Sequence, residues 1–131
     1  MEKNCKMSDV VKVSALSKTW LLDIDGTILK HNGYKIDGYD SFLPGAKEFL
    51  QSIPDKDMII FITARTDDFK EMTIDFMQRN GVRYDQIIFN APYGERILVN
   101  DCKPSGLNMS VAINTERDKF MAQRFVIDES L

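Results

Sequence analysis

The sequence predicts an α/β fold in which helices cover both faces of a parallel sheet. Short apolar runs alternate with amphipathic segments, and these runs lack the regular polar alternation of half-exposed strands. Three of the runs end in carboxylate or hydroxyl side chains, at Asp23 with Asp25, at Thr63 and at Asp101. Strands and helices that alternate in this way form parallel sheets with right-handed crossovers, whose ligands bind at the carboxyl ends of the strands.

In the first half of the chain, residues 1–18 are ambiguous between a short strand and a loosely packed leader. Residues 19–24 form a continuous apolar run, which predicts a buried strand that ends at Asp25 and Gly26. The polar segment 28–43 is expected to be a loop or a short flap. Pro44 then begins a predicted helix that extends to residue 53, because proline suits the first turn of a helix.

In the second half, residues 58–63 predict another buried strand. A helix is expected to begin at Asp67 and to end at Asn80 and Gly81. Three further strands are predicted by short apolar runs, over residues 87–89, 97–99 and 111–113.

Length and composition predict one domain spanning residues 1–131. A chain of 131 residues with 44% hydrophobic residues can bury one sizeable core. The net charge of -3 and the absence of a basic run argue against nucleic acid as a partner. Two cysteines and one histidine disfavour a zinc site, a disulfide scaffold and Cys/His catalysis. Charges interrupt every apolar stretch, so we expect no membrane segment and a reducing compartment such as the cytoplasm.

Residues 23–27, with the sequence Asp-Ile-Asp-Gly-Thr, carry the clearest chemical signal. Two carboxylates one residue apart at a strand end can project in a common direction if the chain turns there, and Gly26 permits that turn. The simpler alternative is an Asp-Gly turn after a strand. A calcium-binding loop is disfavoured, because Ile28 stands where such a loop needs glycine.

With its strand context, this motif resembles the first motif of the haloacid dehalogenase-like (HAD) superfamily. Residues 59–63 are similar to the second motif, a hydrophobic strand that ends in Thr or Ser, and residues 97–101 to the fourth, a hydrophobic strand that ends in acidic residues. The matches occur in the family's order and span residues 19–113. The resemblance implies a Rossmann-like core and a magnesium-dependent phosphatase.

The resemblance also implies a role for each matched residue. Asp23 would attack phosphorus and become an aspartyl phosphate, while Asp25 would protonate the leaving oxygen and later activate water. Thr63 would donate its hydroxyl to a phosphoryl oxygen. Mg²⁺ would bind to Asp23, to the backbone carbonyl of Asp25 and to Asp101. The residues expected to contact the substrate are Gly26, Thr27, Ala64 and Arg65.

The family's usual lysine before the fourth motif is missing, since residues 89–96 contain none. Lys103, two residues beyond Asp101, is the preferred replacement. Arg96 is less favoured, because it begins a predicted strand and would lie at the opposite end of the sheet. Arg65 has the fork geometry that suits phosphate. Asn100 also departs from the family's pattern, because it stands where the family often has an acid.

The segments between the motifs are too short for a cap domain, so the chain resembles small capless phosphatases of bacterial surface-sugar pathways. A sugar phosphate is therefore the expected substrate, and a homo-oligomer would cover the open site. Two alternatives stay open: a phosphomutase on the same scaffold, and a non-catalytic phosphate-binding regulatory domain.

Overall fold

The structure is a computed structural model that describes residues 9–131. It is a mixed α/β arrangement with parallel strands in two small sheets. Residues 1–8 lie outside the described part of the chain, so the choice between a short strand and a loosely packed leader is not tested there. Residues 10–13, from the ambiguous leader, form a strand.

The larger sheet has the strand order β2-β3-β4, with β2 at Thr19–Asp23, β3 at Met58–Ile62 and β4 at Gln86–Ile88. These strands correspond to the first three runs that the sequence predicted. In the register of β2 and β3, Asp23 lies opposite Ile62, so both strands end at the same edge. Thr63 follows β3 directly and its N–H donates to the carbonyl of Ile88 at the end of β4.

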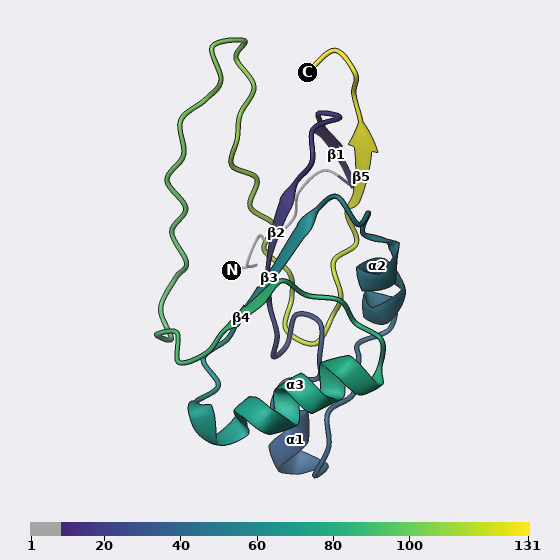
Figure 1. Ribbon diagram of the computed structural model, residues 1–131, viewed down its shortest axis with the longest axis vertical. Coiled ribbons are helices and arrows are strands. Elements are labelled where there is room, and N and C mark those ends of the chain that lie inside the picture. Colours follow the sequence, from purple (N-terminus) through teal and green to yellow (C-terminus); the bar gives the residue numbers. More distant parts are fainter. Residues whose placement is uncertain (1–8) are drawn as a thin grey trace, which may run out of the picture.

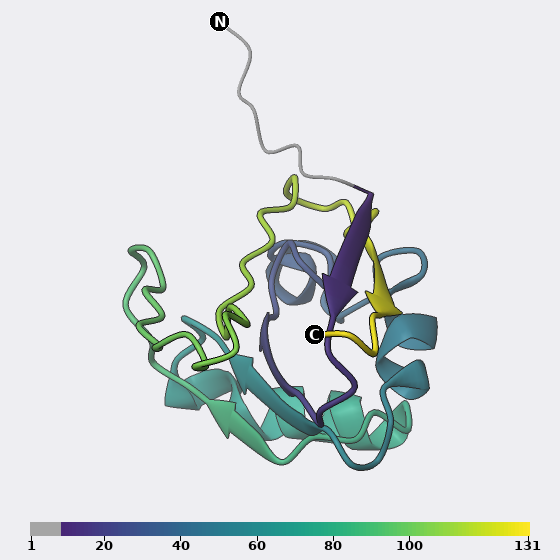
Figure 2. The ribbon, with the colours of Figure 1, turned by 90° about the horizontal axis from the view of Figure 1, so that it is seen from above.

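The smaller sheet pairs β1 (Val10–Val13) with β5 (Arg124–Ile127). It stands apart from the larger sheet in the view of Figure 2. Aromatic side chains join the two sheets, because the ring of Trp20 on β2 packs edge-on against Phe125 of β5 and against Phe49. Phe49 belongs to α2 (Ala46–Ser52), which Figure 1 shows beside this junction.

The remaining helices lie near the carboxyl ends of the large sheet (Figure 1). They are α1 (Gly33–Ile36), the short 3-10 helix η1 (Asp67–Phe69) and α3 (Lys70–Arg79). Thr73, Phe76 and Met77 of α3 are buried. None of the helices within residues 9–131 has the length and apolar character needed to cross a bilayer.

One core cluster supports the edge where the strands end. Its fully buried members come from β3, from α2, from α3 and from the turn that follows β2, which gives this edge a rigid support. These members are Ile24, Ile28, Leu29, Ala46, Ile59, Phe61 and Met77.

The strands predicted over residues 97–99 and 111–113 are absent. Both fall in the long connection between β4 and β5 (residues 89–123), which has neither helix nor strand. Figure 1 shows its first part as an extended green arm that reaches the far end of the molecule before turning back. Ile97 is 85% exposed and Val99 is 89% exposed, so these apolar side chains lack the burial that the prediction assumed. β5 was not predicted.

Candidate active site

The turn after β2 brings the two motif carboxylates to one pocket. The buried Ile24 carbonyl accepts N–H groups from Thr27, Ile28 and Leu29 at 3.2, 3.0 and 3.1 Å. Gly26 adopts a φ of 80°, a left-handed conformation that glycine reaches without strain. Because Ile24 is anchored in the core, its two neighbours Asp23 and Asp25 are both left to line the pocket.

The pocket has a volume of about 280 Å³ and is strongly polar in its lining. Besides the residues of the motif, it is lined by Thr115 and Arg117, which the sequence analysis did not single out. The Asp118 N–H donates to the Gly26 carbonyl at 2.8 Å, and the Asp118 carboxylate accepts the His31 N–H at 2.6 Å. These two bonds dock the end of the long connection on the turn. No local pattern around Arg117 could have signalled this long-range contact.

Each carboxylate oxygen of Asp23 has one partner. The Thr27 hydroxyl donates to Oδ2 at 2.8 Å, and the Arg96 guanidinium donates to Oδ1 at 3.1 Å. The Asp23 side chain is 34% exposed and the Arg96 side chain is 39% exposed, so water screens this ion pair. Arg96 was expected at the opposite end of the sheet, but it belongs to no strand and its guanidinium contacts Asp23.

Asp25 is held from behind by Arg65. The guanidinium donates to both oxygens of Asp25, from Nε at 3.0 Å and from Nη2 at 2.8 Å. It also donates to both oxygens of Asp40, at 3.0 and 2.8 Å, and to the Thr73 hydroxyl at 2.9 Å. An arginine has five N–H donors, and these five bonds use all of them.

The charge of Arg65 is stable in this buried position. Burial by itself disfavours the guanidinium cation, but the hydrogen bonds and negative charges of Asp25 and Asp40 outweigh it and raise the pKa of Arg65 above its ordinary value. The ring of Tyr34 adds a face-on contact, with its centroid 4.1 Å from the guanidinium carbon. Arg65 was expected to contact the substrate, but this arrangement leaves it no free donor.

Thr63 lies at the carboxyl end of β3 with 1% of its surface exposed. Its hydroxyl oxygen accepts a hydrogen bond from the backbone N–H of Arg65 at 3.0 Å. This bond lies in the turn of the chain that positions Arg65. Neither Thr63 nor Ala64 is among the residues that line the pocket. Thr63 is therefore buried at the end of β3 and contributes no surface to the pocket.

Asp101 and Lys103 lie exposed on the long connection, away from the pocket lining. The Asn100 amide is within 3.4 Å of the Asp101 carboxylate, and the Lys103 backbone closes a small turn with Leu107. Because residues 97–99 do not pair with the sheet, they do not deliver Asp101 to the strand ends. Within residues 9–131, no group of three or more His, Cys, Asp or Glu side chains is placed to hold a metal ion.

Comparison with known proteins finds no matching family model, no matching curated protein and no matching solved structure. The chemistry of the pocket must therefore be argued from its own residues. It offers two adjacent carboxylates, hydroxyl groups from Thr27 and Thr115, and cationic groups from Arg96 and Arg117.

Proposed function

We propose that this chain is a phosphomonoesterase that works through an aspartyl phosphate and acts on a small phosphorylated metabolite such as a sugar phosphate. The observation that carries the proposal is the pair Asp23 and Asp25, which line one pocket at the carboxyl end of β2. An arginine on Asp23 and a second arginine in the pocket lining support an anionic substrate.

The first step forms the covalent intermediate. A carboxylate oxygen of Asp23 attacks phosphorus, and the bond from phosphorus to the substrate oxygen breaks with its electron pair on that oxygen. Asp25 acts as the general acid and delivers a proton to the departing oxygen, which leaves as an alcohol.

The second step releases phosphate. Water attacks the phosphorus of the aspartyl phosphate and gives a proton to the Asp25 carboxylate. The bond between phosphorus and Asp23 breaks, which restores the Asp23 carboxylate and releases inorganic phosphate. Two moderate barriers thus replace one high barrier.

The cations have separate tasks in this scheme. Arg96 offsets the negative charge that accumulates when an anionic nucleophile approaches an anionic phosphate. Arg117 lines the pocket and can bind a phosphoryl group through two parallel N–H donors. The Thr27 hydroxyl orients Asp23 through the bond to Oδ2.

Magnesium stays part of the proposal on chemical grounds. Asp23 and the backbone carbonyl of Asp25 are oxygen ligands of the kind that Mg²⁺ prefers, and the bound cation would offset the charge of the phosphoryl group. The third predicted ligand, Asp101, does not lie with them, so the predicted set does not fit this pocket as a whole. We therefore derive no step through a metal.

The test is release of inorganic phosphate from p-nitrophenyl phosphate and from a panel of sugar phosphates. The parent protein should hydrolyse at least one of them, and Asp23→Asn should abolish turnover while far-ultraviolet circular dichroism stays unchanged. Asp75→Asn, which removes an exposed carboxylate paired with Arg79 on α3, is the matched control and should keep full activity. Hydrolysis by Asp23→Asn at the parent rate would exclude the covalent mechanism, and transfer without phosphate release would indicate a mutase.

A further inference from the structure

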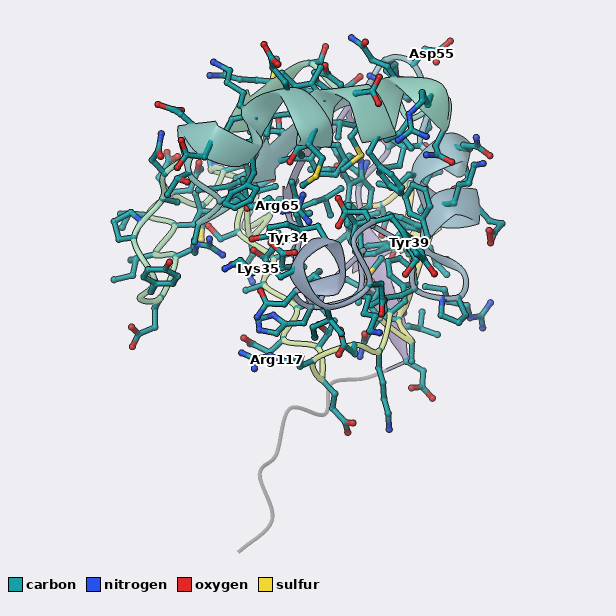
Figure 3. All side chains as sticks on the ribbon, turned by 90° about the horizontal axis from the view of Figure 1, so that it is seen from below. Tyr34, Lys35, Tyr39, Asp55, Arg65 and Arg117 are labelled. Atoms are coloured by element: carbon teal, nitrogen blue, oxygen red, sulfur yellow. The ribbon has the colours of Figure 1, made fainter. Side chains whose placement is uncertain are left out.

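Arg65 connects the proposed acid/base residue to the segment that follows it in the chain. The Arg65 side chain is 1% exposed and that of Asp40 is 1% exposed, whereas that of Asp25 is 18% exposed. The guanidinium therefore separates a buried carboxylate from one that lines the pocket. Figure 3 shows Arg65 beside Tyr34 in the space between α3 and α1, with Arg117 on the other side of α1.

The flap of residues 28–43 contacts this guanidinium at two places. Asp40 accepts two hydrogen bonds from Arg65, and the Tyr34 ring lies 4.1 Å from it. Backbone bonds close the base of the flap, since the Lys30 N–H donates to the Ser41 carbonyl at 3.0 Å and the Leu43 N–H donates to the Ile28 carbonyl at 2.9 Å. The position of the flap and the position of Arg65 are therefore fixed together.

The same guanidinium fixes the orientation of the Asp25 carboxylate. A bidentate contact holds both oxygens, which prevents rotation of the carboxylate about its last side-chain bond. Each oxygen keeps one further lone pair, because a carboxylate has about four acceptor sites. Asp25 therefore keeps acceptor sites for a proton from a group in the pocket while both of its oxygens are bound to Arg65.

We infer that Arg65 and Asp40 form a clamp that positions Asp25 for proton transfer, and that the flap sets this position through Asp40 and Tyr34. The inference rests on the proposed function, because Asp25 needs a defined orientation only if it exchanges a proton with the substrate. Arg65 and Asp40 are positioning residues, since neither lines the pocket.

The clamp has a kinetic signature that a general loss of stability does not share. A phosphate ester with an alkyl leaving group needs the proton from Asp25, whereas p-nitrophenolate leaves without it. The constant kcat/KM covers events up to the first irreversible step, in which the leaving group departs, so it excludes the later hydrolysis that is common to all substrates. The ratio of kcat/KM for the two esters, measured on one sample, is also independent of the folded fraction.

The experiment compares kcat/KM for p-nitrophenyl phosphate and for a sugar 6-phosphate in the parent and in Asp40→Asn. Displacement of a catalytic group by about 1 Å can lower the rate by roughly 100-fold, so we expect about that loss for the sugar ester. The loss for the aryl ester should stay below about fivefold, because general acid assistance is the effect removed. Asp37→Asn, which removes the surface ion pair with Lys30 in the same flap, is the control and should leave the ratio unchanged.

Tyr34→Leu is a second, milder variant, which retains all five hydrogen bonds of Arg65. Loss of the ring contact should change the ratio in the same direction by about fivefold. An unchanged ratio in Tyr34→Leu, or in folded Asp40→Asn, overturns the inference while leaving phosphatase activity in place. Equal activity of Asp23→Asn and the parent would instead overturn the proposed function.

Discussion

Replacement of Arg65 by methionine should strongly destabilise the fold. Methionine is shorter but flexible and of similar volume, and it carries no charge, so the substitution removes all five hydrogen bonds while leaving little cavity. The Asp40 side chain, only 1% exposed, would lose its cation and both of its bonds. A buried charge without its partner costs about 3 to 5 kcal/mol, which is a large part of the stability of a small domain.

Urea unfolding at neutral pH measures this loss. With an m value of about 2 kcal/mol per molar, a loss of about 4 kcal/mol lowers the unfolding midpoint by about 2 M. Arg79→Met makes the same substitution on the surface of α3, where Arg79 and Asp75 are 64% and 63% exposed. That control should lose less than about 0.5 kcal/mol.

A double variant separates the buried ion pair from the rest of the effect. In Arg65→Met combined with Asp40→Asn no buried charge remains, because Asp25 is partly exposed and keeps some hydration. The double variant should therefore be more stable than the sum of the two single losses implies, by about 2 kcal/mol. Equal midpoint shifts for Arg65→Met and Arg79→Met, or strict additivity in the double variant, would refute this reasoning.

Three further predictions concern the site and its support. Arg96→Ala should lower kcat by roughly 100-fold on every substrate, because it removes one donor to the transition state. Lys103→Ala should leave kcat and KM unchanged. The reverse result would restore Lys103 as the cation. A chelator should abolish phosphate release, Mg²⁺ should restore it and Ca²⁺ should do so poorly; full activity in chelator would exclude a metal requirement. The pKa of Asp57 lies below its ordinary value, because burial opposes its charge but the Lys18 and Trp20 N–H groups, both at 3.0 Å, outweigh that effect. Its stabilisation is therefore present above the unfolded pKa of about 3.9 and is lost as pH falls through the folded pKa. Asp57→Asn should lower the free energy of unfolding by about 1 to 3 kcal/mol at neutral pH, and this loss should shrink steadily as the pH is lowered below the unfolded pKa.

The strands of the larger sheet could be predicted because burial leaves a local trace in the sequence. Residues 19–24 and 58–63 are apolar runs, and Ile59, Phe61 and Ile24, which follows β2, have no exposed surface. The burial on both faces that these runs predicted is wrong, because Leu21 of β2 is 52% exposed and Met58 of β3 is 48% exposed. The turn at Gly26 was also readable, since a left-handed residue after a strand favours glycine. The two strands and the turn at Gly26 are determined by residues close together in the chain, so the local sequence pattern is enough to predict them.

The failed strand predictions and the missed residues depend on contacts that no local pattern encodes. The run at residues 97–99 is as apolar as a buried strand, yet its side chains are exposed because it pairs with no strand. Asp40 and Tyr34 lie in a polar flap whose composition indicated only a loop. Both contact the guanidinium of Arg65, which is more than twenty residues away in the chain. Arg117 lines the pocket, and the N–H of its neighbour Asp118 donates to the Gly26 carbonyl of the β2 turn, a contact between residues far apart in the chain.

Three arginines surround the two carboxylates, and their burial separates what each of them can do. Arg65 has no free donor, so it can orient Asp25 but cannot donate a hydrogen bond to a substrate. Arg117 is exposed and lines the pocket, so it can bind a phosphoryl oxygen and release it again. Arg96 is partly exposed and pairs with Asp23 through one nitrogen, which leaves further donors for the phosphate that Asp23 would attack. We therefore propose that Arg96 supplies the charge that the missing lysine would supply, because its screened ion pair with Asp23 can rearrange when an anion binds.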